Sequence, residues 1–208
     1  MNIRDIEKTF AHRIPCPIDT PRYYAVMVPL IKKGEELSIL FEVRSHELQV
    51  QPGEVCFPGG KQEEGESPEE CAIRETCEEL CIKPSQMDVI GPLDYLNAYS
   101  NFTLYPFLCV IEDHVIQEDH FNPDEVHETF QVPLDFFLQQ DPILFTFPVV
   151  PQIPEDFPYH LIGENKEYNW RKGTNQVPIY KYDGHTIWGL TARIILRMAE
   201  VLRKKDRE

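Results

Sequence analysis

Apolar runs separated by short charged turns dominate the first part of the chain. Residues 23–31 form an apolar run that ends at the charged turn 32–36, and a second apolar run follows at 37–43. Two such runs joined by a short turn predict a β-hairpin. A polar stretch then leads to a short run at 54–57, which we expect to be a strand placed directly before the two glycines at 59–60.

A helix start signal follows this strand. Ser67 is suited to cap the first free amides, Pro68 fits the first helical position, and Glu70 completes a capping box. At about 100° per residue, the positions that follow separate into two faces. The apolar arc comprises Ala72, Ile73, Thr76, Cys77 and Leu80, and the opposite arc comprises Arg74, Glu75, Glu78 and Glu79. We therefore expect a short helix that begins at about residue 68 and has one packed face and one charged face.

Glutamates gather on the charged face of this helix. Glu75, Glu78 and Glu79 stand at i, i+3 and i+4, so their carboxylates project close together and repel one another at neutral pH. A solvent-exposed acidic helix face is one interpretation. The other is a cation site, since carboxylate oxygens suit Mg²⁺ or Mn²⁺, and Mg²⁺ commonly joins carboxylates to substrate phosphates. The glycine turn at 57–60 favours the second interpretation, because its amides can approach a phosphate closely.

Fixed positions between residues 60 and 82 form a specific pattern. They are Gly60, Glu66, Arg74, Glu75, Glu78, Glu79 and Ile82. The pattern resembles the signature of the Nudix hydrolases. Two positions depart from it: Thr76 stands where an aliphatic residue is preferred, and Cys81 stands where the signature has glycine. The Thr76 methyl group can still pack, whereas Cys81 affects the helix exit, because glycine is favoured at a left-handed cap.

The resemblance implies an α/β protein with the Nudix fold, a mixed β-sheet sandwiched between α-helices. It also implies hydrolysis of a pyrophosphate bond with Mg²⁺ or Mn²⁺. Glu75 and Glu79 are expected to ligate the metal, with Glu78 as a further ligand. Arg74 is expected to orient a glutamate by ion pairing.

Acidic residues are the candidates for the general base of this hydrolysis. The resemblance implies that either Glu79 or an acid in a later loop takes the proton of the attacking water. Glu125 is the candidate in that loop, and Glu128 is the reserve. An exposed loop acid is the alternative interpretation of Glu125.

The segment before the glycines narrows the resemblance to one subgroup of the family. It contains Arg44, Ser45, Leu48, Gly53, Val55 and the run 57–60, and the later segment 188–193 reads WGLTAR. Both are similar to coenzyme A pyrophosphatases, which implies coenzyme A or an acyl or oxidised derivative as substrate, and 3′,5′-ADP and a 4′-phosphopantetheine as products. Arg44, Ser45, Gly59 and Gly60 are then expected to bind substrate, since an arginine fork matches phosphate oxygens. A surface charge at a strand end is the alternative for Arg44.

Two other functions remain open. The same chemistry would serve ADP-ribose, a nucleotide sugar or a dinucleoside polyphosphate, because the signature specifies the bond and not the attached groups. A Nudix-fold sensor that binds a nucleotide without cleaving it is a different class. The complete set of glutamates weighs against the sensor.

Composition agrees with one enzyme domain spanning 1–208. The chain has 208 residues, of which 42% are hydrophobic, and can bury a core. Its net charge of −15 disfavours nonspecific binding to nucleic acid or anionic membrane. The charged N-terminus lacks a signal peptide and no apolar run reaches membrane-spanning length, which favours a cytoplasmic protein. The family resemblance is compatible with a homodimer.

The six cysteines lack CxxC spacing and are expected to be reduced and mostly buried.

Further elements follow from the same patterns. We expect a short amphipathic helix at 2–12, a strand at 87–96 with a turn at 91–92, and a strand at 104–111. A helix at 135–140, a hairpin at 179–188 and a final helix to about 203 follow. A proline-rich insert at about 141–178 is expected to contain no central strand or long helix. One interpretation of the insert is a lid or specificity loop, in which Tyr168, Trp170, Arg171 and Lys172 offer stacking and charge suited to an adenine nucleotide. An ordered packing loop or dimer contact is the alternative.

Overall fold

A mixed sheet forms the centre of the molecule in the computed structural model, which describes residues 2–13, 18, 22–117, 120–163 and 168–205. Its order is β3-β2-β1-β7-β5, with β4 on β1, β6 on β7 and β8 on β2. The strands are β1 (Arg22–Lys33), β2 (Glu36–Arg44), β3 (Val55–Cys56), β4 (Gly59–Lys61), β5 (Asp88–Pro92), β6 (Leu96–Ala98), β7 (Phe102–Glu112) and β8 (Val126–Pro133). β1 runs parallel to β7, and the other pairs are antiparallel.

The expected hairpin and most strands are confirmed. β1 and β2 pair antiparallel across a turn in which Gly34 has φ of +63°. The strand expected over 87–96, interrupted by a turn at 91–92, is confirmed in its first half: β5 ends at Pro92, and residues 93–95 are not in a strand. Gly91, with φ of +148°, lies inside β5 where the pairing with β7 shifts register. A glycine inside a strand commonly marks such a bulge.

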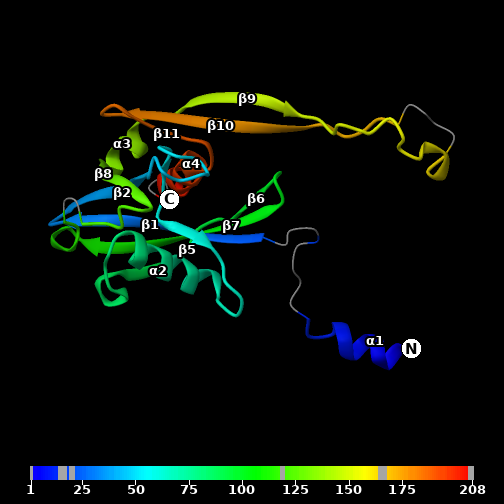
Figure 1. Ribbon diagram of the computed structural model, residues 1–208, viewed down its shortest axis with the longest axis horizontal. Coiled ribbons are helices and arrows are strands. Elements are labelled where there is room, and N and C mark those ends of the chain that lie inside the picture. The colour runs from blue at the N-terminus through cyan, green and yellow to red at the C-terminus, as the bar shows by residue number, and fades with distance from the viewer. Residues whose placement is uncertain (1, 14–17, 19–21, 118–119, 164–167, 206–208) are drawn as a thin grey trace.

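Helices cover both faces of the sheet, as Figure 1 shows. α2 (Pro68–Glu79) lies on one face, where its Cys71, Ala72 and the following Leu80 pack against apolar side chains of β1, β2 and β7. α3 (Leu134–Gln139) and α4 (Gly189–Lys205) lie on the other face. The short 3-10 helices are η1 (Pro84–Gln86), η2 (Asp113–Val115) and η3 (Tyr159–Leu161). The expected sandwich of a mixed sheet between helices is confirmed.

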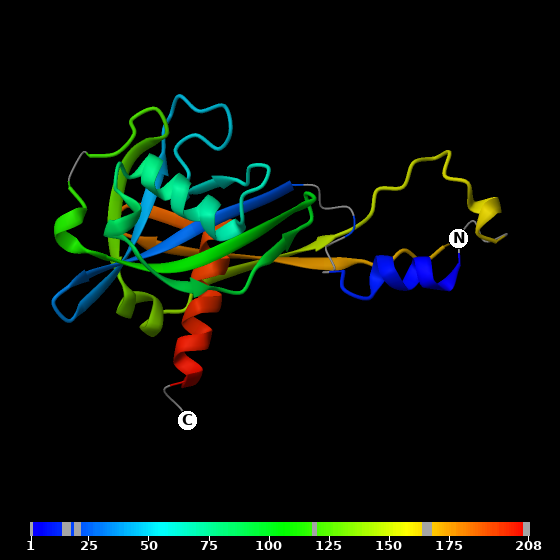
Figure 2. The same ribbon diagram turned by 90° about the horizontal axis from the view of Figure 1, so that it is seen from below.

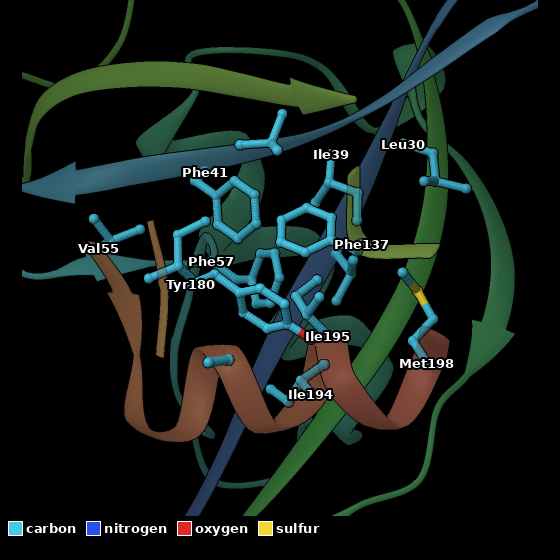
Figure 3. Packing of buried hydrophobic residues seen from close by; sticks show 14 of the residues in the cluster. Leu30, Ile39, Phe41, Val55, Phe57, Phe137, Tyr180, Ile194, Ile195 and Met198 are labelled. Atoms are coloured by element: carbon cyan, nitrogen blue, oxygen red, sulfur yellow. The ribbon is translucent and has the colours of Figure 1, made fainter. Parts of the chain in front are cut away.

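Aromatic side chains fill the core on the α4 side (Figure 3). Phe41, which is fully buried, stacks on Phe57 with ring centroids 5.0 Å apart and on Phe130 at 5.4 Å. Phe137 from α3 packs edge-on against Tyr180 at 5.1 Å. This core joins β2, α3 and α4 to the C-terminal hairpin.

A second sheet contradicts the expectation for the proline-rich insert. Its order is β11-β10-β9, formed by β9 (Ile143–Val149), β10 (Gly173–Tyr182) and β11 (His185–Trp188). β10 is the central strand although it contains Pro178. β11 pairs only with residues Ile179–Tyr182, so β10 has a partner on one side alone at Pro178. A proline is tolerated where one side of a strand is unpaired.

The outer part of the insert extends well beyond the main sheet in both Figure 1 and Figure 2. All residues of β9 except Val149 are exposed. The expected N-terminal helix is confirmed as α1 (Ile3–Phe10), which buries none of its residues and stands apart from the sheet. Among the residues described, no helix is long and apolar enough to cross a bilayer.

The cysteines with described positions are free thiols. Cys71 and Cys109 are buried, Cys56 and Cys77 are half-buried, and Cys81 is exposed. The expectation of burial therefore holds only in part. Cys16 lies outside the described residues.

Candidate active site

The helix that carries the glutamates begins and ends as its sequence indicates. The Ser67 hydroxyl accepts from the Glu70 amide at 3.2 Å, and the Glu70 carboxylate accepts from the Ser67 amide at 2.8 Å, so the capping box is confirmed. Cys81 adopts a left-handed φ of +53°, and the Ile82 amide donates to the Cys77 carbonyl. The chain thus makes the left-handed exit that glycine would favour, with a cysteine at some cost in backbone strain.

Glu79 does not share the exposed face of α2. Only 5% of its surface is exposed, and one of its carboxylate oxygens accepts from the Gly59 amide at 2.7 Å. Burial, with smaller contributions from the charges of Glu75 and Glu125, raises the pKa of Glu79 to about 8 against the opposing effect of the Gly59 amide. The sequence pattern placed this residue on the charged arc. In the structure, β4 covers the end of α2 that carries Glu79, and its Gly59 amide bonds to the Glu79 carboxylate.

The two glycines lie in a strand and not in an open turn. β4 pairs with β1, with Gly59 opposite Val26 and Gly60 opposite Ala25. A Cβ atom on Gly59 would overlap the backbone of β1, and one on Gly60 would overlap the carboxylate of Glu75. Glycine is therefore needed for close packing at both positions. The Gly59 amide, which we expected to approach a phosphate, donates to Glu79.

Arg74 binds two carboxylates of its own helix and that of Glu66, which precedes the helix. Its Nε lies 2.8 Å from Glu66, and its Nη1 lies 2.9 Å from Glu75 and 3.2 Å from Glu78. The hydrogen bond from Arg74 lowers the pKa of Glu66 to about 2. Burial raises the pKa of Glu75, and Arg74 partly opposes that rise. Arg74 thus fixes the position of the Glu75 carboxylate.

One cavity of about 580 Å³ brings together most of the expected site residues. Arg44, Gly59, Gly60, Glu75, Glu79 and Glu125 all line it. We name it the catalytic cavity. The Ser45 amide donates to the Glu125 carbonyl at 2.8 Å, and the Asn122 amide donates to the Glu79 carbonyl at 2.8 Å. These bonds fix the loop of Glu125 against both β2 and the end of α2.

Other expected residues do not line this cavity. Ser45 is buried, and its hydroxyl accepts from the Glu47 amide. The exposed carboxylate of Glu78 bonds to Arg74. The reserve residue Glu128 pairs with His185 at 3.0 Å. Tyr168, Trp170 and Arg171 line a separate depression with residues 149–151, and Lys172 is exposed.

The cavity also contains residues that the sequence analysis did not select. Arg22, Tyr24, Lys61 and Phe102 line it. Lys61 directly follows the signature glycine, so its position carried a usable signal. Arg22 and Phe102 meet through the parallel pairing of β1 with β7, a contact that no local pattern indicates.

A buried acid lies beneath the site. Glu42 of β2 is 1% exposed, and its Oε1 has no hydrogen-bond partner among the described residues. Burial raises the pKa of Glu42 well above its ordinary value, and the charge of Glu79 adds to the rise. The signal for it was a charged residue inside the apolar run 37–43. Negative charge is therefore concentrated around Glu79.

The donor set suits a hard divalent cation. No three His, Cys, Asp or Glu side chains in the described ranges form a ready-made metal cluster. Mg²⁺ does not require one, because it commonly binds through one or two carboxylates, waters and substrate phosphates. Glu75 and Glu79 line the cavity, and their pKa values are raised, so a cation there would offset unfavourable negative charge. The residues present fit Mg²⁺ or Mn²⁺.

The Glu66–Arg74 pair predicts a pH-dependent contribution to stability. Glu66→Gln should lower the free energy of unfolding at pH 7 by about 1 kcal/mol, since solvent screens part of this charged hydrogen bond. The pKa of Glu66 is lower in the folded protein, so its contribution is present above the ordinary value of 4.5 and is lost as pH falls toward 2. Urea unfolding at pH 7, 5 and 3 should show the difference shrinking.

The exposed neighbour Glu64 provides the control. Glu64→Gln should match the wild-type protein in unfolding free energy at each pH. A Glu66→Gln deficit that stays constant from pH 7 to pH 3 would contradict the assignment of this ion pair.

Comparisons with known proteins identify relatives of this chain. A family model described as NUDIX domain matches residues 21–147. The chain is 38% identical over 139 residues to the peroxisomal coenzyme A diphosphatase NUDT7 of Mus musculus. The aligned region covers 66% of this chain and 57% of that protein. It is 29% identical over 205 residues to the uncharacterized Nudix hydrolase NudL of Photorhabdus laumondii, covering 96% and 97%. A crystal structure of a C. elegans Ap4A hydrolase binary complex aligns with a TM-score of 0.45 and 21% identity, over 54% of this chain and 80% of that one.

The family match decides the identity of the fold and the class of enzyme. The chain spans less than two thirds of the mouse relative's length, so that protein's substrate is not transferred with the family. The family model, in contrast, covers more than half of this chain and includes every residue placed in the catalytic cavity except Leu190. The chain therefore belongs to the Nudix hydrolase family of pyrophosphohydrolases.

Proposed function

We propose that this enzyme hydrolyses the pyrophosphate bond of coenzyme A or its derivatives, releasing 3′,5′-ADP and a 4′-phosphopantetheine. One observation carries the proposal: Arg44 and the glycines of the coenzyme A pyrophosphatase-like segment line the same cavity as Glu75 and Glu79. The likeness to the mouse protein named coenzyme A diphosphatase supports the same substrate class.

Cationic side chains in the cavity supply the charge that an anionic substrate needs. Arg22, Arg44 and Lys61 line it, in a chain whose net charge is −15. The guanidinium of Arg44 is held by a hydrogen bond from Nε to the Val50 carbonyl at 3.3 Å. Its Nη groups carry further donors suited to phosphate oxygens. Arg44 is therefore assigned to the pyrophosphate.

Carboxylates are assigned to metal binding and to proton transfer. Glu75 and Glu79 would hold the divalent cation, with Glu78 as a further candidate. When bound, such a cation lowers the pKa of water and neutralises charge that develops on the phosphoryl oxygens. Glu79 or Glu125 accepts the proton of the attacking water at a carboxylate oxygen, since both line the cavity. Arg74 acts as a positioning residue, because it fixes Glu75 from outside the cavity.

Product analysis tests the substrate. The purified protein, with Mg²⁺ or Mn²⁺, is incubated with a mixture of coenzyme A, acetyl coenzyme A, ADP-ribose and a dinucleoside polyphosphate, and products are identified by mass spectrometry. We expect 3′,5′-ADP and phosphopantetheine products to form first. Preferential cleavage of ADP-ribose or the dinucleotide would reject the coenzyme A assignment. Absence of cleavage by folded protein with either metal would favour a nucleotide-binding sensor.

The close contact at Gly60 predicts a selective loss of activity. In Gly60→Ala the new methyl group meets the Glu75 carboxylate, so Glu75 must move away from its place in the cavity. We expect kcat/KM for the preferred substrate to fall by about 100-fold, as for a small misplacement of a catalytic group. Steady-state kinetics and circular dichroism measure activity and folding.

Gly173→Ala is the matched control, because a Cβ atom there makes only an ordinary contact with Val149. It should retain wild-type kinetics. Full activity in a folded Gly60→Ala enzyme would rule out the role of this glycine in positioning Glu75.

A further inference from the structure

A second cavity adjoins the catalytic cavity. Its volume is about 450 Å³, and the two share walls at Val26, Arg44, Gln51, Ser100, Phe102, Leu104 and Leu190. We name it the adjoining cavity. The rest of its wall is mainly apolar, and includes Val55, Phe147, Val177 and Trp188. An apolar cavity with a few polar groups is typical of a site that takes an organic ligand.

The proline-rich insert and the C-terminal segment build this wall together. Phe147 comes from β9, and Asn175, Gln176 and Val177 come from β10. Trp188 ends β11, and Thr191 lies in the first turn of α4. The Thr191 hydroxyl donates to the Val55 carbonyl at 3.2 Å, which ties the start of α4 to β3. The base of the insert, and not its outer end, therefore reaches the catalytic region.

Charge distinguishes the two cavities. Arg22 and Lys61 line the catalytic cavity alone, beside the aromatic ring of Tyr24. The adjoining cavity has Arg193 and the acidic Glu54 as its own charged residues, with the amides of Asn175 and Gln176. Beside the carboxylates assigned to the metal, Arg22 and Lys61 give the catalytic cavity two cations suited to the phosphates of a nucleoside. An uncharged chain with amide groups and an apolar end suits the adjoining cavity.

We propose that the adjoining cavity binds the pantetheine chain of the substrate and the acyl group attached to it, with Phe147 and Trp188 as the residues that contact this chain. The inference rests on the proposed function and assigns the two halves of the substrate to the two cavities. Arg44, which lines both, then lies at the pyrophosphate between them. The adenosine half, with its 3′-phosphate, lies toward Arg22 and Lys61.

Tryptophan fluorescence tests this placement without turnover. The chain has two tryptophans, so Trp170→Phe leaves Trp188 as the single reporter. This variant is titrated separately with 4′-phosphopantetheine, with its S-decanoyl derivative and with 3′,5′-ADP. We expect both pantetheine compounds to shift the Trp188 emission, with about tenfold tighter binding of the decanoyl compound, and 3′,5′-ADP to leave the emission unchanged.

Phe147 and Phe145 provide a matched pair on one strand. Both are exposed enough to be dispensable for the core, but only Phe147 lines the adjoining cavity. Added to the reporter variant, Phe147→Ala should weaken binding of the decanoyl compound by about tenfold, as for an aromatic contact at a binding site. Phe145→Ala should leave it unchanged.

Three results would overturn the inference: a shift with 3′,5′-ADP alone, no shift with the pantetheine compounds, or unchanged affinity in Phe147→Ala. The substrate mixture described above separates this failure from that of the proposed function. Turnover of coenzyme A by a protein whose Trp188 does not respond removes the inference alone. Absence of coenzyme A turnover removes the proposed function and this inference with it.

Discussion

The site depends on a buried carboxylate surrounded by like charges. Glu79 is held by a single backbone amide, that of Gly59, while Glu75, Glu125 and the fully buried Glu42 lie near it. Arg44 opposes this negative charge only in part, so burial of the carboxylate is costly and a raised pKa is the expected response. A divalent cation would offset this cost. The charge repulsion that makes the ionised site unfavourable without a metal therefore favours metal binding. The bound metal in turn favours binding of a phosphate.

The fold supplies this arrangement by bringing separate segments to one cavity. β4 places Gly59 and Gly60 under α2, and their missing side chains leave room for β1 and for Glu75. Backbone bonds from Ser45 and Asn122 fix the loop of Glu125. Arg74 holds Glu75 from outside. Glu75 is thus positioned by Arg74, and Glu79 by the backbone amide of Gly59.

Short-range sequence patterns predicted much of the site. The features that depend on long-range strand pairing were not predicted. The capping box of α2 and the left-handed exit at Cys81 follow from short-range rules, and both are present. The burial of Glu79 was missed because helical periodicity does not show which part of a helix a strand will cover. Arg22 was missed because its place depends on the pairing of β1 with β7. The proline rule failed at Pro178, since only the register shows that one side of β10 is unpaired there.

Metal binding tests the central claim most directly. Mn²⁺ titration of the wild-type protein and of Glu79→Gln, followed by electron paramagnetic resonance, measures affinity at the site itself and needs no substrate. Removal of one ligand charge should weaken Mn²⁺ binding by more than about tenfold, while circular dichroism shows an unchanged fold. Equal Mn²⁺ affinity in the two proteins would show that the cation does not bind at Glu79 and would contradict the account.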